Sequence, residues 1–114
     1  MRRIFISLIL FLFLSIGSSA VATVIDRGTC GRNGDNVTWS FTDDGKLTIE
    51  GTGEMGIYID YPWGSYQGEI KTVDIKLGVT NIGVGAFYDC SSLTSVIIPN
   101  SVISIGDDSF QGCI

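Results

Sequence analysis

The sequence contains no histidine, the residue on which much enzyme chemistry depends. Ser-His-Asp and Cys-His nucleophilic sites and histidine metal sites are therefore excluded. The carboxylate pairs Asp43-Asp44 and Asp107-Asp108 lie in predicted turns, where adjacent side chains point apart into solvent and do not form an acid–base couple. The polar run 33–36 lacks the ligand spacing of a calcium loop. We predict a protein that is not an enzyme and binds no metal.

Basic side chains are also few. The chain has 7 Lys and Arg against 12 Asp and Glu, a formal net charge of −5 at pH 7. Neutralising phosphates requires clustered Lys and Arg, so this balance argues against nucleic acid or an anionic membrane as a partner. The acidic charge identifies no partner by itself, because in a secreted protein it often serves only solubility.

The N-terminal segment 1–22 has the three-part organisation of a secretory signal peptide. Arg2-Arg3 is followed by the apolar run Ile4 to Ile16 and by the small-residue site Ala20-Val21-Ala22. An uncleaved membrane anchor is the alternative, since a bilayer span needs roughly 20 apolar residues; the small and polar residues 17–19 favour cleavage. We expect 1–22 to be removed, leaving a secreted or cell-surface protein that is not held by the membrane and has a formal charge of −7.

What the sequence does contain is an internal repeat, in which the pattern of 73–90 recurs at 96–113. Apolar and glycine positions are held at this period, whereas the positions between them change freely, which is typical of stacked coils that share one core. We therefore predict a β-rich solenoid with two repeats, 70–92 and 93–114. The identical pairs are Val73/Val96, Ile75/Ile98, Val79/Val102, Ile82/Ile105, Gly83/Gly106, Phe87/Phe110 and Cys90/Cys113.

Each repeat begins with the L-x-x-L-x-L spacing of a leucine-rich repeat, which predicts a short strand with alternate residues in the core. The predicted core residues are Val73, Ile75, Val96 and Ile98. The later spacing of three to five residues up to Cys90 suits helical or 3-10 turns on the back of the coil. Gly83 and Gly106 are expected at a corner where the chain turns tightly or coils approach closely.

Residues 23–69 differ from the repeats and predict an N-terminal β-rich cap with an aromatic connector. Val37, Trp39 and Phe41 alternate with polar residues, a turn follows at 42–45, and Leu47 and Ile49 alternate again, which predicts a β-hairpin. Such a hairpin would cover the open end of the solenoid core. The G-x-G-x-x-G run at 51–56 matches a dinucleotide-binding motif, but no amphipathic helix follows it, so we interpret it as a turn-rich connector and expect no cofactor.

Three cysteines leave at least one thiol unpaired within the chain. Cys90 and Cys113 occupy the same repeat position and should stack one coil apart as small apolar fillers. Strand spacing of about 4.8 Å is within range for a disulfide, but parallel side-chain directions make the bond awkward, so buried thiols are favoured. The pairing of Cys30 stays open.

The motifs of the chain resemble those of the BspA-like leucine-rich-repeat surface proteins. These motifs are I-G-x-x-A/S-F-x-x-C at 82–90 and 105–113, S-x-L-x-S-V-x-I-P-x-S-V ending at Val102, G-T-C-G at 28–31, V-T-W-S at 37–40, G-K-L-T-I at 45–49 and G-T-G-E-M at 51–55. The resemblance implies a cell-surface or secreted protein, and some members are adhesins for host matrix and plasma proteins. Members usually have many more repeats. Because this chain stops at Ile114 within the array, we expect either a fragment of a longer protein or self-association through the uncovered last coil.

Two functions follow as hypotheses. The first is a non-catalytic, adhesin-like recognition module that binds a protein partner, such as a host matrix or surface protein, through exposed strand positions of the repeats: Thr72, Asp74, Lys76, Ser95 and Ile97. The alternative is a small carbohydrate-binding module that uses the aromatic cluster Tyr58, Tyr61, Trp63 and Tyr66. The same cluster could instead wedge the cap against the first coil, and a purely structural array is also consistent with the repeats. A buried Trp63 would exclude the carbohydrate-binding function.

Overall fold

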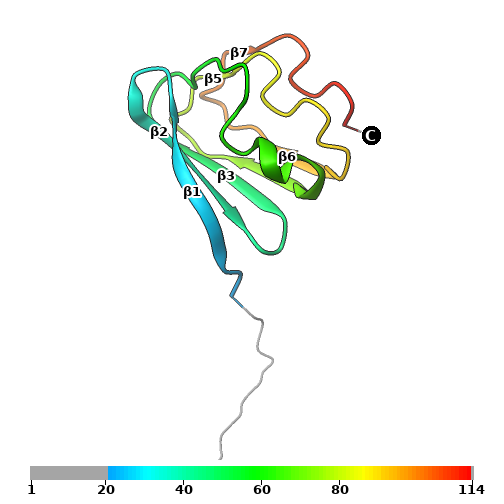
Figure 1. The fold of residues 1–114 in the computed structure, drawn as a ribbon. Coiled ribbons are helices and arrows are strands. Elements are labelled where there is room, and N and C mark those ends of the chain that lie inside the picture. The colour runs from blue at the N-terminus through cyan, green and yellow to red at the C-terminus, as the bar shows by residue number, and fades with distance from the viewer. Residues whose placement is uncertain (1–20, 114) are drawn as a thin grey trace, which may run out of the picture.

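A computed structural model describes residues 21–113, and the chain is strand-rich (Figure 1). Its elements are β1 (Val24–Gly31), β2 (Gly34–Thr42), β3 (Lys46–Gly51), the 3-10 helix η2 (Gly64–Glu69), β4 (Thr72–Ile75), β5 (Asn81–Ile82), β6 (Ser95–Ile97) and β7 (Ser104–Ile105). A five-stranded sheet has the order β1-β2-β3-β4-β6, and β5 pairs with β7. The predicted signal peptide, 1–22, lies outside the described residues except for its last two. Within 21–113, no helix is long and apolar enough to cross a bilayer.

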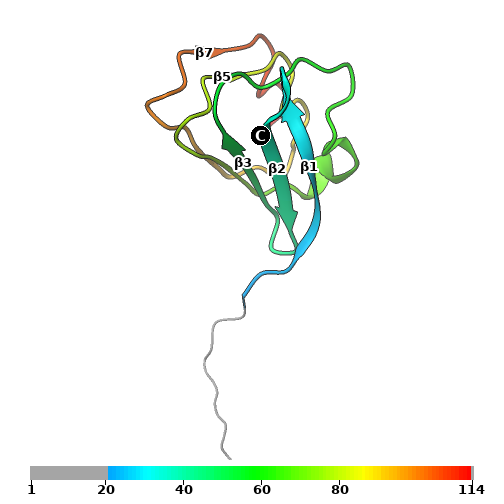
Figure 2. The ribbon, with the colours of Figure 1, turned by 90° about the vertical axis from the view of Figure 1, so that its left-hand side faces the viewer.

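The predicted hairpin is present as β2 and β3. The two strands are antiparallel, with Trp39 opposite Ile49 and Phe41 opposite Leu47, and all four side chains are buried. Their alternation with polar residues places one face of the hairpin in the core and the other in solvent. The strand β1, which the sequence did not predict, pairs antiparallel with β2 and forms the edge of the sheet (Figure 2).

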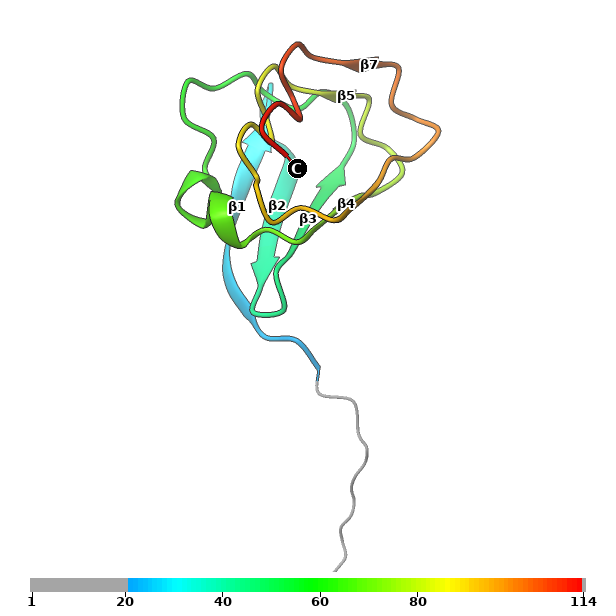
Figure 3. The same ribbon diagram turned by 90° about the vertical axis from the view of Figure 1, so that its right-hand side faces the viewer.

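The hairpin and the two repeats share one sheet. β3 pairs in parallel with β4, and β4 pairs in parallel with β6, so that Leu47, Val73 and Val96 lie in one row across the strands. On the far side, β5 and β7 also pair in parallel, with Ile82 opposite Ile105. Figure 3 shows the two repeats as superposed coils around one interior. The register confirms the predicted offset of one repeat between the coils.

The core is complete in the first coil and only half covered in the second. Val73 and Ile75 are buried, whereas Val96 is half-buried and Ile98 is 42% exposed. The prediction that Ile98 lies in the core is therefore wrong. The physical reason is that the first coil covers one side of the second coil, while no residue among 21–113 covers its other side.

The back of the coil consists of single tight turns: hydrogen bonds of the 3-10 type, as the spacing predicted, close each turn, but no helix forms over residues 83–113. Gly85 and Asp89 have φ of 66° and 55°, in the left-handed region, and such residues interrupt a helix. The amides along this segment alternate in their acceptors. Those of Ala86, Tyr88 and Cys90 donate to the carbonyl three residues earlier, whereas those of Gly85, Phe87 and Asp89 donate across to the second coil, at Asp107, Ser109 and Gln111.

Candidate functional site

The outward side of the five-stranded sheet is the candidate site. Opposite residues in a sheet point to the same side, so the register aligns Arg27, Ser40, Thr48, Asp74 and Ile97 in one row across all five strands. We name this surface the outer sheet face. By the same alternation, its members are Arg27, Thr29, Thr38, Ser40, Lys46, Thr48, Glu50, Thr72, Asp74, Lys76, Ser95 and Ile97.

Four of the five site residues predicted from the repeats have exposed or partly exposed side chains on this face. Lys76 and Ser95 are exposed, Thr72 is half-buried, and the apolar Ile97 is 55% exposed. The hydroxyls of Ser95 and Thr72 lie 3.4 Å apart, so the strands of the two repeats also contact each other through their outward side chains.

Asp74 is the exception, because it is buried and not exposed as predicted. Its Oδ2 lies 2.9 Å from Nζ of Lys76 and 3.5 Å from Nζ of Lys46, and the two lysine side chains cover it. The hydrogen bond from Lys76 holds the pKa of the Asp74 carboxyl below its usual range, against the opposing effect of desolvation. The same hydrogen bond raises the pKa of Lys76. Asp74 therefore positions two ammonium groups on the face.

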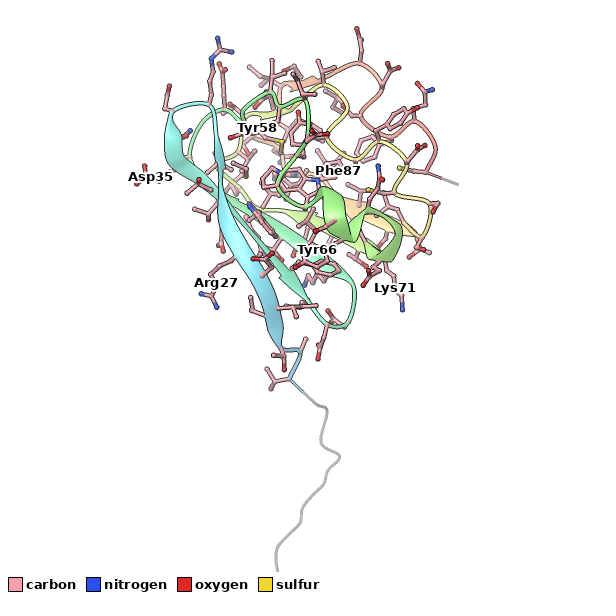
Figure 4. The ribbon with its side chains drawn as sticks, in the orientation of Figure 1. Arg27, Asp35, Tyr58, Tyr66, Lys71 and Phe87 are labelled. Carbon is pink, nitrogen blue, oxygen red and sulfur yellow. The ribbon has the colours of Figure 1, made fainter. Side chains whose placement is uncertain are left out.

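Two residues of the aromatic cluster, Tyr61 and Trp63, lie in the core between connector and first coil, and the other two, Tyr58 and Tyr66, are half-buried against this core. Trp63 is 1% exposed, and its ring stacks on Tyr61 at a centroid distance of 5.0 Å and on Phe87 at 5.8 Å. Phe87 in turn stacks on Phe110 at 5.5 Å. Tyr66, which comes from η2 in the connector (Figure 4), stacks on Phe41 of β2 at a centroid distance of 4.6 Å. A sugar ring has no access to Trp63, so the carbohydrate-binding alternative loses its central residue.

Polar groups of the connector hydrogen-bond the first coil at regular positions. The hydroxyl of Tyr61 donates to the carbonyl of Val84 at 2.9 Å, and Nε1 of Trp63 donates to that of Ala86 at 2.9 Å. A side-chain amide of the connector, from Gln67, donates to the carbonyl of Tyr88.

In the second coil, the carbonyls at the equivalent repeat positions are those of Asp107, Ser109 and Gln111. There they accept from backbone amides of the first coil. Side chains of the connector thus take the place that the amides of a preceding coil would occupy. The polar carbonyls of the first coil are satisfied without another repeat.

The three cysteines are free thiols. Cys30 and Cys90 are buried, and burial raises the pKa of each thiol to about 12. The predicted burial of the thiol is confirmed for Cys90, whereas Cys113 is half-buried and its thiol donates to the carbonyl of Phe87 at 2.9 Å. Over the described part of the chain, no three His, Cys, Asp or Glu side chains are grouped as metal ligands would be.

Short parallel strands that recur once in each repeat, with tight turns behind them, define a leucine-rich-repeat type of fold. Residues 65–114 match the family described as BspA type Leucine rich repeat region (6 copies). This region is therefore a BspA-type leucine-rich repeat, and the resemblance indicated by the motifs is confirmed. No curated protein matches the chain.

The fold is similar to the crystal structure of a leucine-rich repeat protein from Eubacterium ventriosum ATCC 27560, with a TM-score of 0.68 and 31% sequence identity. The match covers 82% of this chain and 24% of that protein. The chain thus spans about a quarter of the length of this relative.

Sequence reasoning missed the part of the outer sheet face that comes from the N-terminal strands. A groove of about 540 Å³ lies there, and the residues that line it are Val24, Arg27, Gly28, Thr29, Thr38, Trp39, Ser40 and Glu50. The alternation in the sequence did indicate that the polar residues of β2 and β3 face solvent. It gave no indication that β3 pairs in parallel with β4, which makes the hairpin continuous with the repeats.

Proposed function

We propose that this protein is a non-catalytic recognition module, secreted or on the cell surface, that binds a protein partner through the outer sheet face in the manner of an adhesin. The observation that carries the proposal is the continuous row of outward side chains across five strands, from Arg27 to Ile97. Hydrogen-bonded strands hold these side chains at fixed spacing, which lowers the entropy cost of binding. Membership in a repeat family that generally binds proteins supports this function.

We also propose that β1, β2 and β3 are the N-terminal cap of a leucine-rich-repeat solenoid, with 23–69 as cap and connector and 70–114 as repeats. Parallel pairing of β3 with β4 supports a cap that extends the sheet of the repeats. The hydrogen bonds from Tyr61 and Trp63 support a cap that also closes the turn side of the first coil. Host matrix or surface proteins are the proposed partners.

The experiment is a binding assay of purified protein against a panel of immobilised matrix and plasma proteins: fibronectin, fibrinogen and collagen. The face variant combines Thr72→Tyr, Ser95→Tyr and Ile97→Tyr, because three large uncharged side chains block the face without opening the core and without changing its charge. The control variant Tyr88→Arg changes an exposed residue of the turn side. We expect loss of binding in the face variant alone, with unchanged circular dichroism. Equal binding by the two variants would refute the proposed face.

Self-association is a second proposal, located at the outer edge of the second coil. Ile98 and Ile105 are 42% and 53% exposed there. The amides of Asp108, Phe110 and Gly112 have no acceptor among residues 21–113. Apolar side chains next to unpaired backbone groups favour pairing with another chain. Sedimentation velocity over a range of concentrations tests this, and Ile98→Lys with Ile105→Lys should abolish any association; a wild-type chain that stays monomeric at high concentration refutes it.

A further inference from the structure

Charge is distributed unevenly over the molecule. Residues 21–113 contain five basic side chains, and three of them, Arg27, Lys46 and Lys76, belong to the outer sheet face. Of the twelve acidic side chains, only Glu50 and Asp74 belong to it. The other acidic residues lie in turns, in the connector, at the start of β2 and on the inward side of β1. The outer sheet face is thus the basic side of an acidic protein.

The exposed layer of this face is more positive than its composition suggests. The side chain of Asp74 is 7% exposed, whereas those of Lys46 and Lys76 are 43% and 51% exposed. One buried carboxylate therefore offsets only one of two ammonium groups. A carboxylate of a partner can approach both lysines from solvent without meeting Asp74 first.

The dimensions of the face suit an extended polypeptide. Five strands about 4.8 Å apart make the row from Arg27 to Ile97 about 19 Å wide, the length of about six extended residues. Arg27 lies beside the groove at one end of the row, and an exposed isoleucine lies at the other. Ser40, Thr48 and the buried Asp74 lie between them in this row, and two further hydroxyl residues, Thr72 and Ser95, lie in the row that begins at Lys46.

We propose that the outer sheet face binds an acidic, extended segment of a protein partner, with carboxylates set against Lys46, Lys76 and Arg27 and an apolar side chain against Ile97. This inference rests on the proposed function and adds the chemistry of the partner. A sulfated polysaccharide fits less well, since none of the outward side chains of the face is aromatic and Trp39, which lines the groove, is only 5% exposed, too little for a sugar ring to stack on it. Glu50 also interrupts the positive charge that a continuous polyanion would need.

The test uses two labelled peptides of equal length, one alternating Glu with Val and one alternating Lys with Val, in fluorescence anisotropy titrations. We expect the chain to bind the Glu peptide and not the Lys peptide, and we expect the affinity to fall with rising salt because exposed charges are screened. The variant Lys46→Gln with Lys76→Gln should weaken binding about tenfold or more, as two charge pairs at a partly desolvated face are lost.

Lys71→Gln is the matched control for this charge change. Lys71 is exposed but precedes the outward position Thr72, and Figure 4 shows its side chain extending away from the body of the protein. Replacing Lys71 should change the affinity for the Glu peptide less than about twofold, because an exposed charge that does not contact the peptide contributes little to binding. Circular dichroism of all variants checks the fold, and Arg27→Gln, which has no part in the Asp74 ion pairs, supplies a second face variant that should also weaken binding.

Three results would overturn the inference. These are equal losses for Lys71→Gln and the face variants, binding of the Lys peptide, or tighter binding of a heparin fragment than of the Glu peptide. Failure here is distinguishable from failure of the proposed function. If the lysine variants retain matrix-protein binding while the combined Thr72→Tyr, Ser95→Tyr and Ile97→Tyr variant abolishes it, the outer sheet face is supported as the binding surface and its acidic partner is refuted.

Discussion

Phe87 and Phe110 occupy the same position in successive repeats, yet their truncation should have unequal effects. Phe87 is 0% exposed and lies between the ring of Trp63 and that of Phe110. Phe110 is half-buried, and one face of its ring stacks on the ring of Phe87. Phe87→Ala removes contacts on both faces of the ring, whereas Phe110→Ala removes them mainly on one.

The magnitudes follow from burial. Complete burial of a phenylalanine removes roughly 150 to 250 Å² from water, worth about 4 to 6 kcal/mol at about 25 cal/mol per Å². Alanine retains part of this, and measured Phe→Ala costs are about 3 to 5 kcal/mol. Half the burial predicts about 2 kcal/mol for Phe110→Ala. A domain of about 90 residues has a total stability of about 5 to 14 kcal/mol, so Phe87→Ala removes a large part of it.

Urea titration is the assay, followed both by the fluorescence of the two tryptophans and by far-ultraviolet circular dichroism. Coincident transitions for the two probes would justify a two-state free energy. If Phe87→Ala is too unstable to purify, Phe87→Leu nearly conserves volume and should cost about 1.5 kcal/mol. Equal costs for Phe87→Ala and Phe110→Ala would refute the stacking of the coils on which this reasoning rests.

Three further predictions concern charge, backbone packing and thiols. The pKa of Asp74 is lowered in the folded protein, so the ionised carboxylate contributes fully to the free energy of unfolding above its unfolded-state pKa near 4, and this contribution is lost as the pH falls through the lower folded-state pKa. In urea titrations, the difference in free energy of unfolding between wild type and Asp74→Asn should therefore be present at pH 7 and should shrink below about pH 4. Gly83→Ala should lower the thermal midpoint, since its Cβ would meet the connector at 2.9 Å or closer, whereas Gly68→Ala, with nothing within 4 Å, should change it little; equal shifts would contradict the packing. A thiol reagent at pH 8 should modify Cys113 before Cys30, and urea should remove the difference; fast labelling of Cys30 in the folded protein would contradict its burial.

The register of the repeats could be predicted because local spacing determines it. Identical residues one repeat apart must lie opposite one another when coils stack in parallel, and the pairing of Val73 with Val96 follows directly. The hairpin was predictable for a similar reason, since period-2 alternation around a turn leaves one register that buries Trp39 and Phe41. The predicted close approach of the coils is found at Gly106, where a Cβ would clash with Val84 of the first coil, whereas a Cβ at Gly83 would clash with the connector.

Two features of the outer sheet face could not be predicted, because each depends on a non-local contact. The burial of Asp74 requires Lys46, which comes from β3 in the cap. The strand β1 has no alternating signal, because its outer half, from Val24, is exposed on both sides at the sheet edge. The repeat half of the face was therefore predicted from the sequence, and the half that contains Arg27 was not.

On the turn side the spacing did not distinguish a helix from consecutive tight turns, because apolar residues three to five positions apart fit more than one backbone. Consecutive tight turns bring Ile82, Phe87 and Cys90 into the core as a helix would. The distinguishing feature is the positive φ of Asp89, which its residue type does not reveal, since aspartate tolerates this region without requiring it.

The alternating amides of the turns give the stack a direction. On the turn side, donors of the first coil point toward the second, so the second coil presents the amides of Asp108, Phe110 and Gly112 outward and has already used its facing carbonyls. If two copies met through this edge with their turns superposed, the outward amides of one copy would face the outward amides of the other, and neither would find an acceptor. A closed two-fold dimer of that kind is disfavoured, whereas a coil that runs in the same direction would offer carbonyls in the matching positions. The first coil of another copy has no such carbonyls to offer, because those of Val84 and Ala86 already accept from Tyr61 and Trp63 of the connector. The turn side of this edge is thus complementary to a further repeat, and self-association of the chain would have to use the exposed side chains of Ile98 and Ile105 instead.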